Sequence, residues 1–453
     1  MELLFLGATK TVTGSKYLIN FGSQNILLDC GLFQGLKELR LRNWEKFPIP
    51  IQNIDAIVLT HAHIDHTGYL PLLVKNGYNR SIYTTAGTKE LCEILLPDSG
   101  HLQEEEANYA NRHNYSKHHP ALPLYTKEDA LKVMKYMNVR PYNSPFSPLK
   151  DIQATFLRAG HIIGASMVKF QSQGRSLTFM GDLGRPNDLI MRPPVFLEET
   201  DYLVIETTYG NRLHEKSDPR DLLADIINKT IKKGGSLIIP AFAVGRAQSL
   251  SYYITSLKKQ QRIPNIPVFL DSPMSINATN IFYNHSDEHR LSPLECNLMS
   301  EGITFTQTPG ESKNLDTDQI SKIIISASGM ATGGRILHHI KYFAPNSRNT
   351  ILFAGYQADG TRGDKLLRGE SEIKLLGETV PVRAEIVNLT NVSAHADYEE
   401  MLEWLSHLKR PPKKIFLTHG SEEAALCLQE KIHEKFGWEN CIIPSYMDKE
   451  ILK

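Results

Sequence analysis

The sequence predicts an α/β protein in which two β-rich segments enclose a segment of alternating strands and helices. The first 75 residues read as short apolar strands joined by polar, Gly-containing turns. After Glu206 the pattern changes to apolar strand-like runs separated by helical patterns, which is typical of parallel β-α-β units. From Ala384 onward the pattern resembles the first segment more than the middle one. We therefore expect a second α/β domain between two parts of the first.

The first part should be mostly strands, with one helical interruption. A helical pattern begins at Thr88, and the polar stretch 101–123 reads as a surface excursion because it has few apolar anchors. The strands expected on either side are 2–7, 16–21, 25–29, 56–60, 154–157, 168–171 and 176–180.

The middle and last parts give the remaining elements. In the middle, strands are expected at 236–240, 267–271 and 322–327, and helices at 246–258 and 335–343. The tail should contain a strand at 384–389, a helix at 398–407, a strand beginning at 413 and a final helix. The expected domains are 1–207 and 387–453 for the first domain and 208–386 for the inserted one.

Composition describes a globular chain of 453 residues with a balanced charge. There are 50 Lys and Arg against 50 Asp and Glu, 41% hydrophobic residues and 22% charged residues. A core of this size needs no disulfide or structural metal for stability, so a metal would serve chemistry. The zero balance argues against nucleic-acid binding through overall basicity.

Cysteine usage and hydropathy bear on the compartment. The five cysteines lie far apart without a C-x-x-C pair, which fits neither a disulfide framework nor a thiolate zinc site. The start MELLFLGATKTVTGS lacks the pattern of a signal peptide, and no apolar run approaches about 18 residues. We expect a cytoplasmic protein without a membrane span.

The most informative motif follows the apolar run AIVLT. Three imidazoles and one carboxylate lie within six positions: His61, His63, Asp65 and His66. Residues i and i+2 leaving a strand point the same way, and the chain then turns into a helix, so these side chains can converge on one point. Such a set suits zinc.

This H-x-H-x-D-H pattern resembles the signature of the metallo-β-lactamase fold, and further positions match that family's order of motifs. They are Asp29 in LLDCG, His161 in AGHIIGA, Asp182 in FMGDLGR and His419 in FLTHG. The resemblance implies an αββα sandwich.

Two features narrow the resemblance to the β-CASP branch, the nucleases related to the cleavage and polyadenylation specificity factor and to RNA-processing exonucleases such as ribonuclease J. That branch carries a domain inserted before the last histidine, and here an α/β segment separates Asp182 from His419. It also has an acidic strand end, matched by Glu206 in LVIETTYG, and a Ser-x-His motif, matched by His395 in NVSAHAD. The expected fold class is therefore α/β, a metallo-β-lactamase αββα sandwich with an inserted parallel α/β (β-CASP) domain.

The resemblance implies a ribonuclease with two Zn²⁺ ions, which leaves a 5′-phosphate and a 3′-hydroxyl. By the family pattern, His61, His63 and His161 would hold one ion, and Asp65, His66 and His419 the other. Asp182 would bridge the two ions, and Asp29 would support a ligand by a hydrogen bond. The catalytic side chains would be Asp65, His395 as general acid, and Glu206 as its partner.

RNA contacts are expected in the inserted domain. Residues 226–270 and 319–358 contain no Asp or Glu but several Lys and Arg. Arg246 and Arg335 lie at Gly-rich strand-to-helix turns, where a helix amino terminus favours phosphate. Ser393 could bond the scissile phosphate. Phe242 and Tyr356 could stack on bases, although a role in the core is the favoured interpretation for both. We expect single-stranded RNA bound with low sequence preference.

Some alternatives stay open at this point. A DNA-directed nuclease of the same family, a small-molecule metallo-hydrolase and an inactive RNA-binding scaffold each fit part of the pattern. Every expected ligand is present, which disfavours the scaffold, while His419 stands where RNA-directed members keep a histidine. The sequence does not decide between internal cleavage and cleavage from the 5′ end. The carboxy-terminal segment 441–453 offers an apolar edge for a homodimer.

Overall fold

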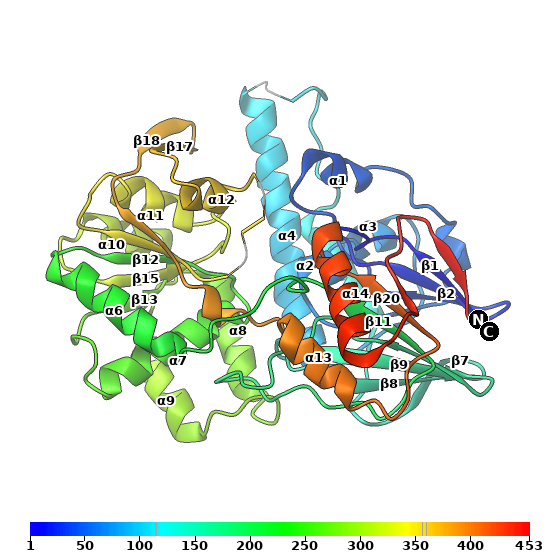
Figure 1. Ribbon diagram of the computed structural model, residues 1–453. Helices are drawn as coiled ribbons and strands as arrows, with labels where there is room; N and C mark the ends of the chain where they lie inside the picture. The colour runs from blue at the N-terminus through cyan, green and yellow to red at the C-terminus, as the bar shows by residue number, and fades with distance from the viewer. Residues whose placement is uncertain (114–115, 356, 359) are drawn as a thin grey trace. The chain divides into compact units, whose positions relative to one another are not determined.

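The computed structural model describes residues 1–113, 116–355, 357–358 and 360–453 (Figure 1). The chain divides into two compact units. The first unit consists of residues 1–213 and 395–453, and the second consists of residues 214–394. The domain boundaries expected at 207/208 and 386/387 stay predictions.

The first unit is built on two seven-stranded sheets. The first sheet contains, in spatial order, β22 (Lys449–Ile451), β1 (Glu2–Phe5), β2 (Tyr17–Asn20), β3 (Asn25–Leu28), β4 (Ala56–Val58), β5 (Ile82–Thr84) and β6 (Met137–Val139). The second contains β21 (Cys441–Ile442), β20 (Lys414–Thr418), β11 (Tyr202–Glu206), β10 (Arg175–Phe179), β9 (Ser166–Ser172), β8 (Ile152–Arg158) and β7 (Phe146–Leu149). Strands β3 to β6 pair parallel in the first sheet, as do β10, β11, β20 and β21 in the second.

The two sheets share one apolar core. Phe5 of β1 packs against Phe416 of β20 with ring centroids 5.3 Å apart, and Tyr17 of β2 lies 5.3 Å from Phe179 of β10. These rings belong to a single buried cluster that contains side chains of both sheets. Burial of so much apolar surface is the main stabilising term for this sandwich.

Helices cover the sheets of the first unit, with α4 against β6 and α14 against β20. They are α1 (Lys37–Arg42), α2 (Ile64–Thr67), α3 (Leu70–Lys75), α4 (Ala86–His113), α5 (Lys127–Val133), α13 (Tyr398–Ser406) and α14 (Glu422–Phe436), with 3₁₀ turns at Ile51–Asn53 and Met134–Tyr136. Together with the two sheets they give the predicted αββα arrangement. The expected surface excursion 101–123 is partly wrong, because α4 continues to His113 and buries Ala107 and Ala110.

The second unit contains a parallel sheet, as predicted. Its six strands are, in spatial order, β14 (Thr304–Phe305), β13 (Val268–Leu270), β15 (Ile323–Ser326), β12 (Leu237–Pro240), β16 (Thr350–Phe353) and β19 (Glu385–Asn388). Every neighbouring pair is parallel. A separate antiparallel hairpin is formed by β17 (Glu372–Leu375) and β18 (Glu378–Pro381). Residues 384–389 do not belong with the first part of the chain, because β19 pairs with β16.

Several helices of the second unit begin at a side-chain cap. Ser272, Ser292, Thr308 and Thr361 each accept a backbone N–H of the first turn, which compensates the amides left open at a helix start. The helices are α6 (Pro219–Lys232), α7 (Arg246–Lys259), α8 (Pro273–Asn284), α9 (Pro293–Glu301), α10 (Pro309–Thr317), α11 (Ile336–Phe343) and α12 (Arg362–Leu367), followed by a 3₁₀ turn at Thr390–Val392. None of the helices in the described ranges has the length and hydropathy that a membrane crossing requires.

Candidate metal centre

Strand ends of the first unit bring the predicted polar side chains together. Asp29 follows β3, residues 61–66 follow β4, Asp182 follows β10, Glu206 ends β11 and His419 follows β20. Neighbouring parallel strands end at the same edge of a sheet, so each sheet presents its polar residues on one side.

Two neighbouring loops hold the backbone of the histidine motif. The amide of Ser15 donates to the carbonyl of Asp65 at 2.8 Å, and the amide of Cys30 donates to the carbonyl of His66 at 2.7 Å. Gly31 lies so close that a Cβ there would stand 1.5 Å from the Asp65 carbonyl oxygen. Glycine in LLDCG therefore lets the loop after Asp29 support the motif from behind.

A first group of ligand atoms gathers three histidines and one carboxylate. His63 Nδ1 lies 3.1 Å from His61 Nε2 and 3.3 Å from His161 Nε2. Asp182 Oδ2 lies 3.4 Å from the same nitrogen of His61 and 3.6 Å from that of His161. All four ligand atoms lie within 4.8 Å of one another, as a single metal ion requires.

A second group lies beside the first. His66 Nε2 and His419 Nε2 are 3.0 Å apart, and Asp65 Oδ2 lies 3.4 Å from the His419 nitrogen. The other oxygen of Asp182, Oδ1, lies 3.4 Å from His66 Nε2. Asp182 thus presents one oxygen to each group.

The surroundings of the Asp182 carboxylate indicate whether the site suits a metal. It is 2% exposed, and its Oδ1 has no hydrogen-bond partner among the described residues. A buried carboxylate oxygen without a donor is costly unless a cation compensates it. A donor set of imidazoles and carboxylates suits zinc, and the orphaned oxygen fits an ion in the second group.

The protonation states favour metal binding in the first group. Burial lowers the pKa of all three imidazoles, to about 3 at His63, so each presents a lone pair near neutral pH. Burial disfavours the charge on Asp182, but the neighbouring His419 and His66 hold the pKa of this carboxyl well below its ordinary value. The bridging group is therefore anionic.

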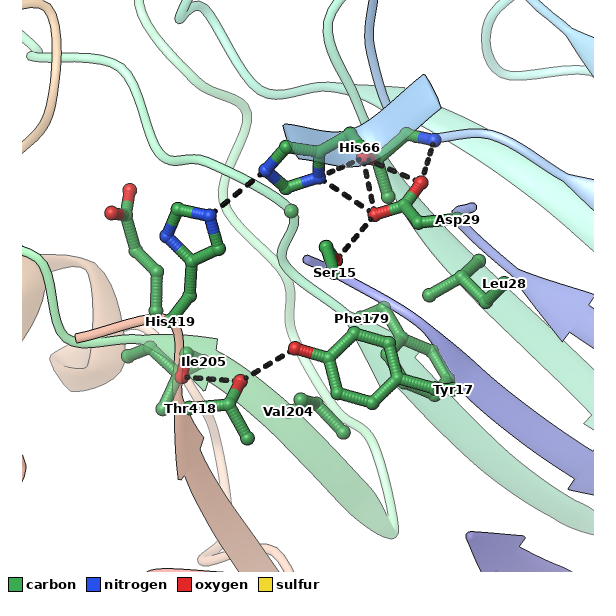
Figure 2. Close-up of a pocket in the computed structure, with 13 residues that line it drawn as sticks. Ser15, Tyr17, Leu28, Asp29, His66, Phe179, Val204, Ile205, Thr418 and His419 are labelled. Atoms are coloured by element: carbon green, nitrogen blue, oxygen red, sulfur yellow. Dashed lines mark hydrogen bonds and ion pairs between the residues drawn. The ribbon is translucent and has the colours of Figure 1, made fainter. Parts of the chain in front are cut away.

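Asp29, expected to support a ligand, contacts His66 and its neighbours. Its carboxylate accepts the Nδ1–H of His66 at 2.8 Å, the hydroxyl of Ser15 at 3.0 Å, and the backbone N–H of Thr60 at 2.8 Å (Figure 2). In the neutral imidazole, which is the form that binds a metal, the bond to Nδ1 leaves Nε2 of His66 as the nitrogen with a lone pair. That nitrogen points toward His419 and the second group.

The half-buried His395 and the buried Glu206 form a pair beside this centre. His395 Nδ1 lies 2.9 Å from Glu206 Oε2, and the backbone N–H of Leu183 donates to Oε1 at 2.5 Å. A bridge between Gly184 and His395 fixes the backbone. Burial lowers the pKa of His395, but the Glu206 carboxylate outweighs it and raises this pKa to about 9. The imidazole therefore carries a proton at neutral pH.

The predicted RNA contacts lie on other parts of the chain. Ser393 and Arg246 belong to the second unit, where Arg246 is the first residue of α7. The Arg335 guanidinium donates within that unit to Asp271 Oδ1 at 2.6 Å and to the carbonyl of Gln307 at 2.8 Å. Phe242 packs against Gly329, and Tyr356 lies outside the described residues. Their roles in RNA binding stay predictions.

Segments 226–270 and 319–358, which contain no Asp or Glu, are contacted in the folded chain by acidic residues from elsewhere. Lys229 and Lys233 both contact Glu385, at 2.5 and 2.7 Å, and Lys341 contacts Glu378 at 2.7 Å. Lys322 is buried and donates to backbone carbonyls. Acidic residues from outside each window thus neutralise part of the charge that the sequence seemed to concentrate.

Sequence reasoning missed the hydroxyl residues around the centre. Ser15 and Thr60 bond Asp29, and Thr208 bonds Glu206 at 2.5 Å. A usable signal existed for Thr208, because it follows the acidic strand end by two positions. For Ser15 and Thr60 only the folded strands bring the hydroxyls to the carboxylate.

Comparison with known proteins places three domain families along the chain. A metallo-beta-lactamase superfamily domain matches residues 18–203, a Beta-Casp domain matches 247–366, and a Zn-dependent metallo-hydrolase RNA specificity domain matches 379–444.

Several characterised proteins resemble nearly the whole chain. Ribonuclease TTHA0252 of Thermus thermophilus is 33% identical over 94% of this chain and 95% of its own. Transcription termination factor FttA of Methanosarcina mazei is 29% identical over 96% of this chain and 69% of its own. An RNase J-like protein of Methanocaldococcus jannaschii is 27% identical over 98% of this chain and 97% of its own. A solved structure of a protein of unknown function from Enterococcus faecalis shares the fold, with a TM-score of 0.55, 14% identity, and coverage of 100% of this chain and 99% of that one.

Proposed function

Because this chain belongs to the β-CASP ribonuclease family of the metallo-β-lactamase superfamily, whose members are metal-dependent hydrolases acting on RNA, we propose that it cleaves RNA phosphodiester bonds with two zinc ions. The products are a 5′-phosphate and a 3′-hydroxyl. One observation carries the two-metal proposal: Asp182 directs one carboxylate oxygen to each of two ligand groups.

The ligands divide between the two groups. His61, His63 and His161 would hold one zinc ion, while Asp65, His66 and His419 would hold the other, and Asp182 would offer one carboxylate oxygen to each group. Bound zinc supplies a nucleophile near neutral pH and neutralises charge on the phosphoryl oxygens. Asp29 keeps Nε2 of His66 available by accepting the proton on Nδ1.

His395 is the general acid in this proposal. Its Nδ1–H donates to the Glu206 carboxylate at 2.9 Å, which stabilises the cationic imidazole, and Nε2–H is the proton that the leaving 3′-oxygen would take. The Leu183 amide fixes the other oxygen of Glu206, so the carboxylate cannot turn away from His395. Asp65 completes the catalytic set as a metal ligand.

RNA binding is proposed to involve the phosphate backbone of single strands, with low sequence preference. Ser393 and the helix-start residue Arg246 are the proposed contacts, while Arg335 contributes through its bonds to Asp271 and Gln307 within the second unit. Binding through phosphates predicts a strong fall in affinity with salt. Affinity that is independent of salt, or that differs strongly between sequences, would contradict it.

Three further parts of the proposal are separately testable. Internal cleavage and 5′-to-3′ cleavage are both included, and product lengths over time on RNA blocked at its 5′ end distinguish them. The proposed homodimer predicts twice the chain mass in light scattering. The proposed cytoplasmic location rests on five cysteines, none of them in a disulfide.

Incubation of the purified protein with labelled single-stranded RNA and DNA tests the main proposal. We expect RNA cleavage, two zinc ions per chain by mass spectrometry, and loss of both on chelation. Cleavage of DNA in place of RNA would favour a DNA-directed nuclease. Hydrolysis of small esters without RNA cleavage would favour a small-molecule hydrolase.

A further inference from the structure

The hydroxyl of Thr208 lies between the His395–Glu206 pair and the second ligand group. Its Oγ1 is 2.5 Å from Glu206 Oε2 and 3.3 Å from His419 Nδ1. The same oxygen lies 3.1 Å from the His419 carbonyl. Thr208 thus touches both a proposed partner of the general acid and a proposed metal ligand.

The single proton of this hydroxyl determines the hydrogen-bond directions. A threonine hydroxyl donates one hydrogen bond and accepts others, whereas a carboxylate only accepts. The short separation from Glu206 is typical of a hydroxyl donating to a carboxylate. Two acceptors compete for this proton, and the charged Glu206 oxygen at 2.5 Å is favoured over the His419 carbonyl at 3.1 Å. A lone pair of Oγ1 then remains for the His419 ring.

It follows that His419 donates from Nδ1 to Thr208. The next acceptor near that nitrogen, Asp182 Oδ1, lies 3.6 Å away and beyond hydrogen-bond distance. In the neutral imidazole, which is the form that binds a metal, a proton on Nδ1 places the lone pair of His419 on Nε2. That nitrogen is the one that lies 3.0 Å from His66 Nε2 and 3.4 Å from Asp65 Oδ2.

We propose that Thr208 is a positioning residue that selects the metal-binding tautomer of His419 and at the same time anchors Glu206 for His395. The inference rests on the proposed two-metal function. Asp29 has the same relation to Nδ1 of His66, so each imidazole of the second group has its Nδ1 proton bound by a neighbouring oxygen. Loss of such a partner typically weakens metal affinity by about 10- to 100-fold.

The adjacent threonine supplies a matched control. The hydroxyl of Thr207 donates to the backbone carbonyl of Thr418 at 3.1 Å, and its side chain is fully buried. Thr207→Val therefore removes one threonine hydroxyl next to β20 without touching Glu206 or the His419 ring. Thr208→Ser keeps the hydroxyl and tests whether that group alone is needed.

The experiment titrates zinc-loaded protein with a chelator and measures the zinc retained per chain. For Thr208→Val we expect one equivalent to be lost at a roughly 10- to 100-fold lower chelator concentration, and the other equivalent to be lost as in the wild type. Thr208→Ser and Thr207→Val should follow the wild-type curve. At saturating zinc, kcat of Thr208→Val should still fall by about 10-fold or more, with KM within about twofold.

Three results would overturn the inference: a wild-type curve for Thr208→Val, an equal shift of both equivalents, or the same loss in Thr208→Ser. Failure of the two-metal function would be seen elsewhere, because the wild type itself would then bind fewer than two zinc ions.

Discussion

The Nδ1 atom of His395 lies 2.9 Å from Oε2 of Glu206, which ends strand β11. The two residues are far apart in sequence, and the inserted unit separates them. The first prediction follows from this pair, which places a protonated imidazole beside the candidate metal centre.

Replacement of His395 by Ala should retain both zinc ions and lower kcat by about 100- to 10,000-fold, the usual contribution of a general acid. Zinc content and single-turnover RNA cleavage are the measurements. His419→Ala is the contrasting variant, because it removes a ligand and should lose zinc. Cleavage by His395→Ala at the wild-type rate would remove His395 from the mechanism.

Replacement of Asp29 by Asn should weaken zinc binding by about 10- to 100-fold, because an amide presents only one oxygen to donors that now share two. Chelator titration measures the effect. Asp55→Asn is the control, since Asp55 bonds Asn25 and Arg80, remote from the ligands. Equal zinc retention in both variants would contradict the supporting role of Asp29.

Gly31→Ala should destabilise the first unit by about 1–3 kcal/mol, because the new Cβ would stand 1.5 Å from the Asp65 carbonyl oxygen. Since that carbonyl belongs to the histidine motif, zinc should also be bound more weakly. Urea unfolding and zinc content are the measurements. Gly310→Ala is a suitable control, because a Cβ at Gly310 meets only Thr308 Oγ1, at 4.0 Å; a similar loss there would show a general sensitivity to added methyl groups.

Stability should depend on pH through His339 of the second unit. Its ring nitrogens lie 2.7 Å from Asp271 Oδ2 and 2.6 Å from Asp316 Oδ1. Burial lowers the pKa of His339, but the two carboxylates outweigh it and raise this pKa above its ordinary value. The stabilisation is fully present below the unfolded pKa of about 6.5 and is lost as pH rises through the folded pKa.

The variant His339→Gln tests this dependence. At pH 6 it should be less stable than the wild type by about 3 kcal/mol, because the buried Asp271 and the partly buried Asp316 lose a cationic partner. The difference in urea unfolding free energy should narrow as pH rises. A difference that stays constant from pH 6 to 9 would mean that His339 is neutral in the folded protein.

Arg335→Ala should lower the stability of the second unit by about 2 kcal/mol, since the guanidinium bonds Asp271 and the carbonyl of Gln307. RNA affinity at equal folded fraction should change less than in Arg246→Ala. Thermal unfolding and RNA titration together measure both effects. A large affinity loss with unchanged stability would instead make Arg335 a direct RNA contact.

The grouping of the candidate ligands could be anticipated from sequence because these residues follow strands. Residues 61–66 form one dense motif, and the other candidate ligands come after apolar runs that are easily read as strands. The alternation of strands and helices indicated an α/β protein, and the resemblance of the motifs to a known family supplied the sandwich. What the sequence could not provide was pairing between distant segments: β19 looked like part of the first unit, but its hydrogen bonds go to β16.

The ion-pair partners of the lysines and the hydrogen-bond partners of the hydroxyl groups could not be predicted either, because they also come from distant segments. The acid-free window 226–270 seemed strongly basic, but Glu385, more than a hundred positions away, contacts two of its lysines. Thr208 gained a role only when the parallel pairing of β11 with β20 brought His419 beside it. Such contacts depend on strand register, which composition and spacing do not define.

The parallel pairing of β20 with β11 has a consequence for biosynthesis. The first ligand group needs no residue beyond Asp182, so it can assemble early during synthesis. The second group needs His419, which the ribosome adds only after the whole inserted unit. On the proposed assignment of ligands, the two-metal centre of a nascent chain therefore stays incomplete until β20 has joined β11.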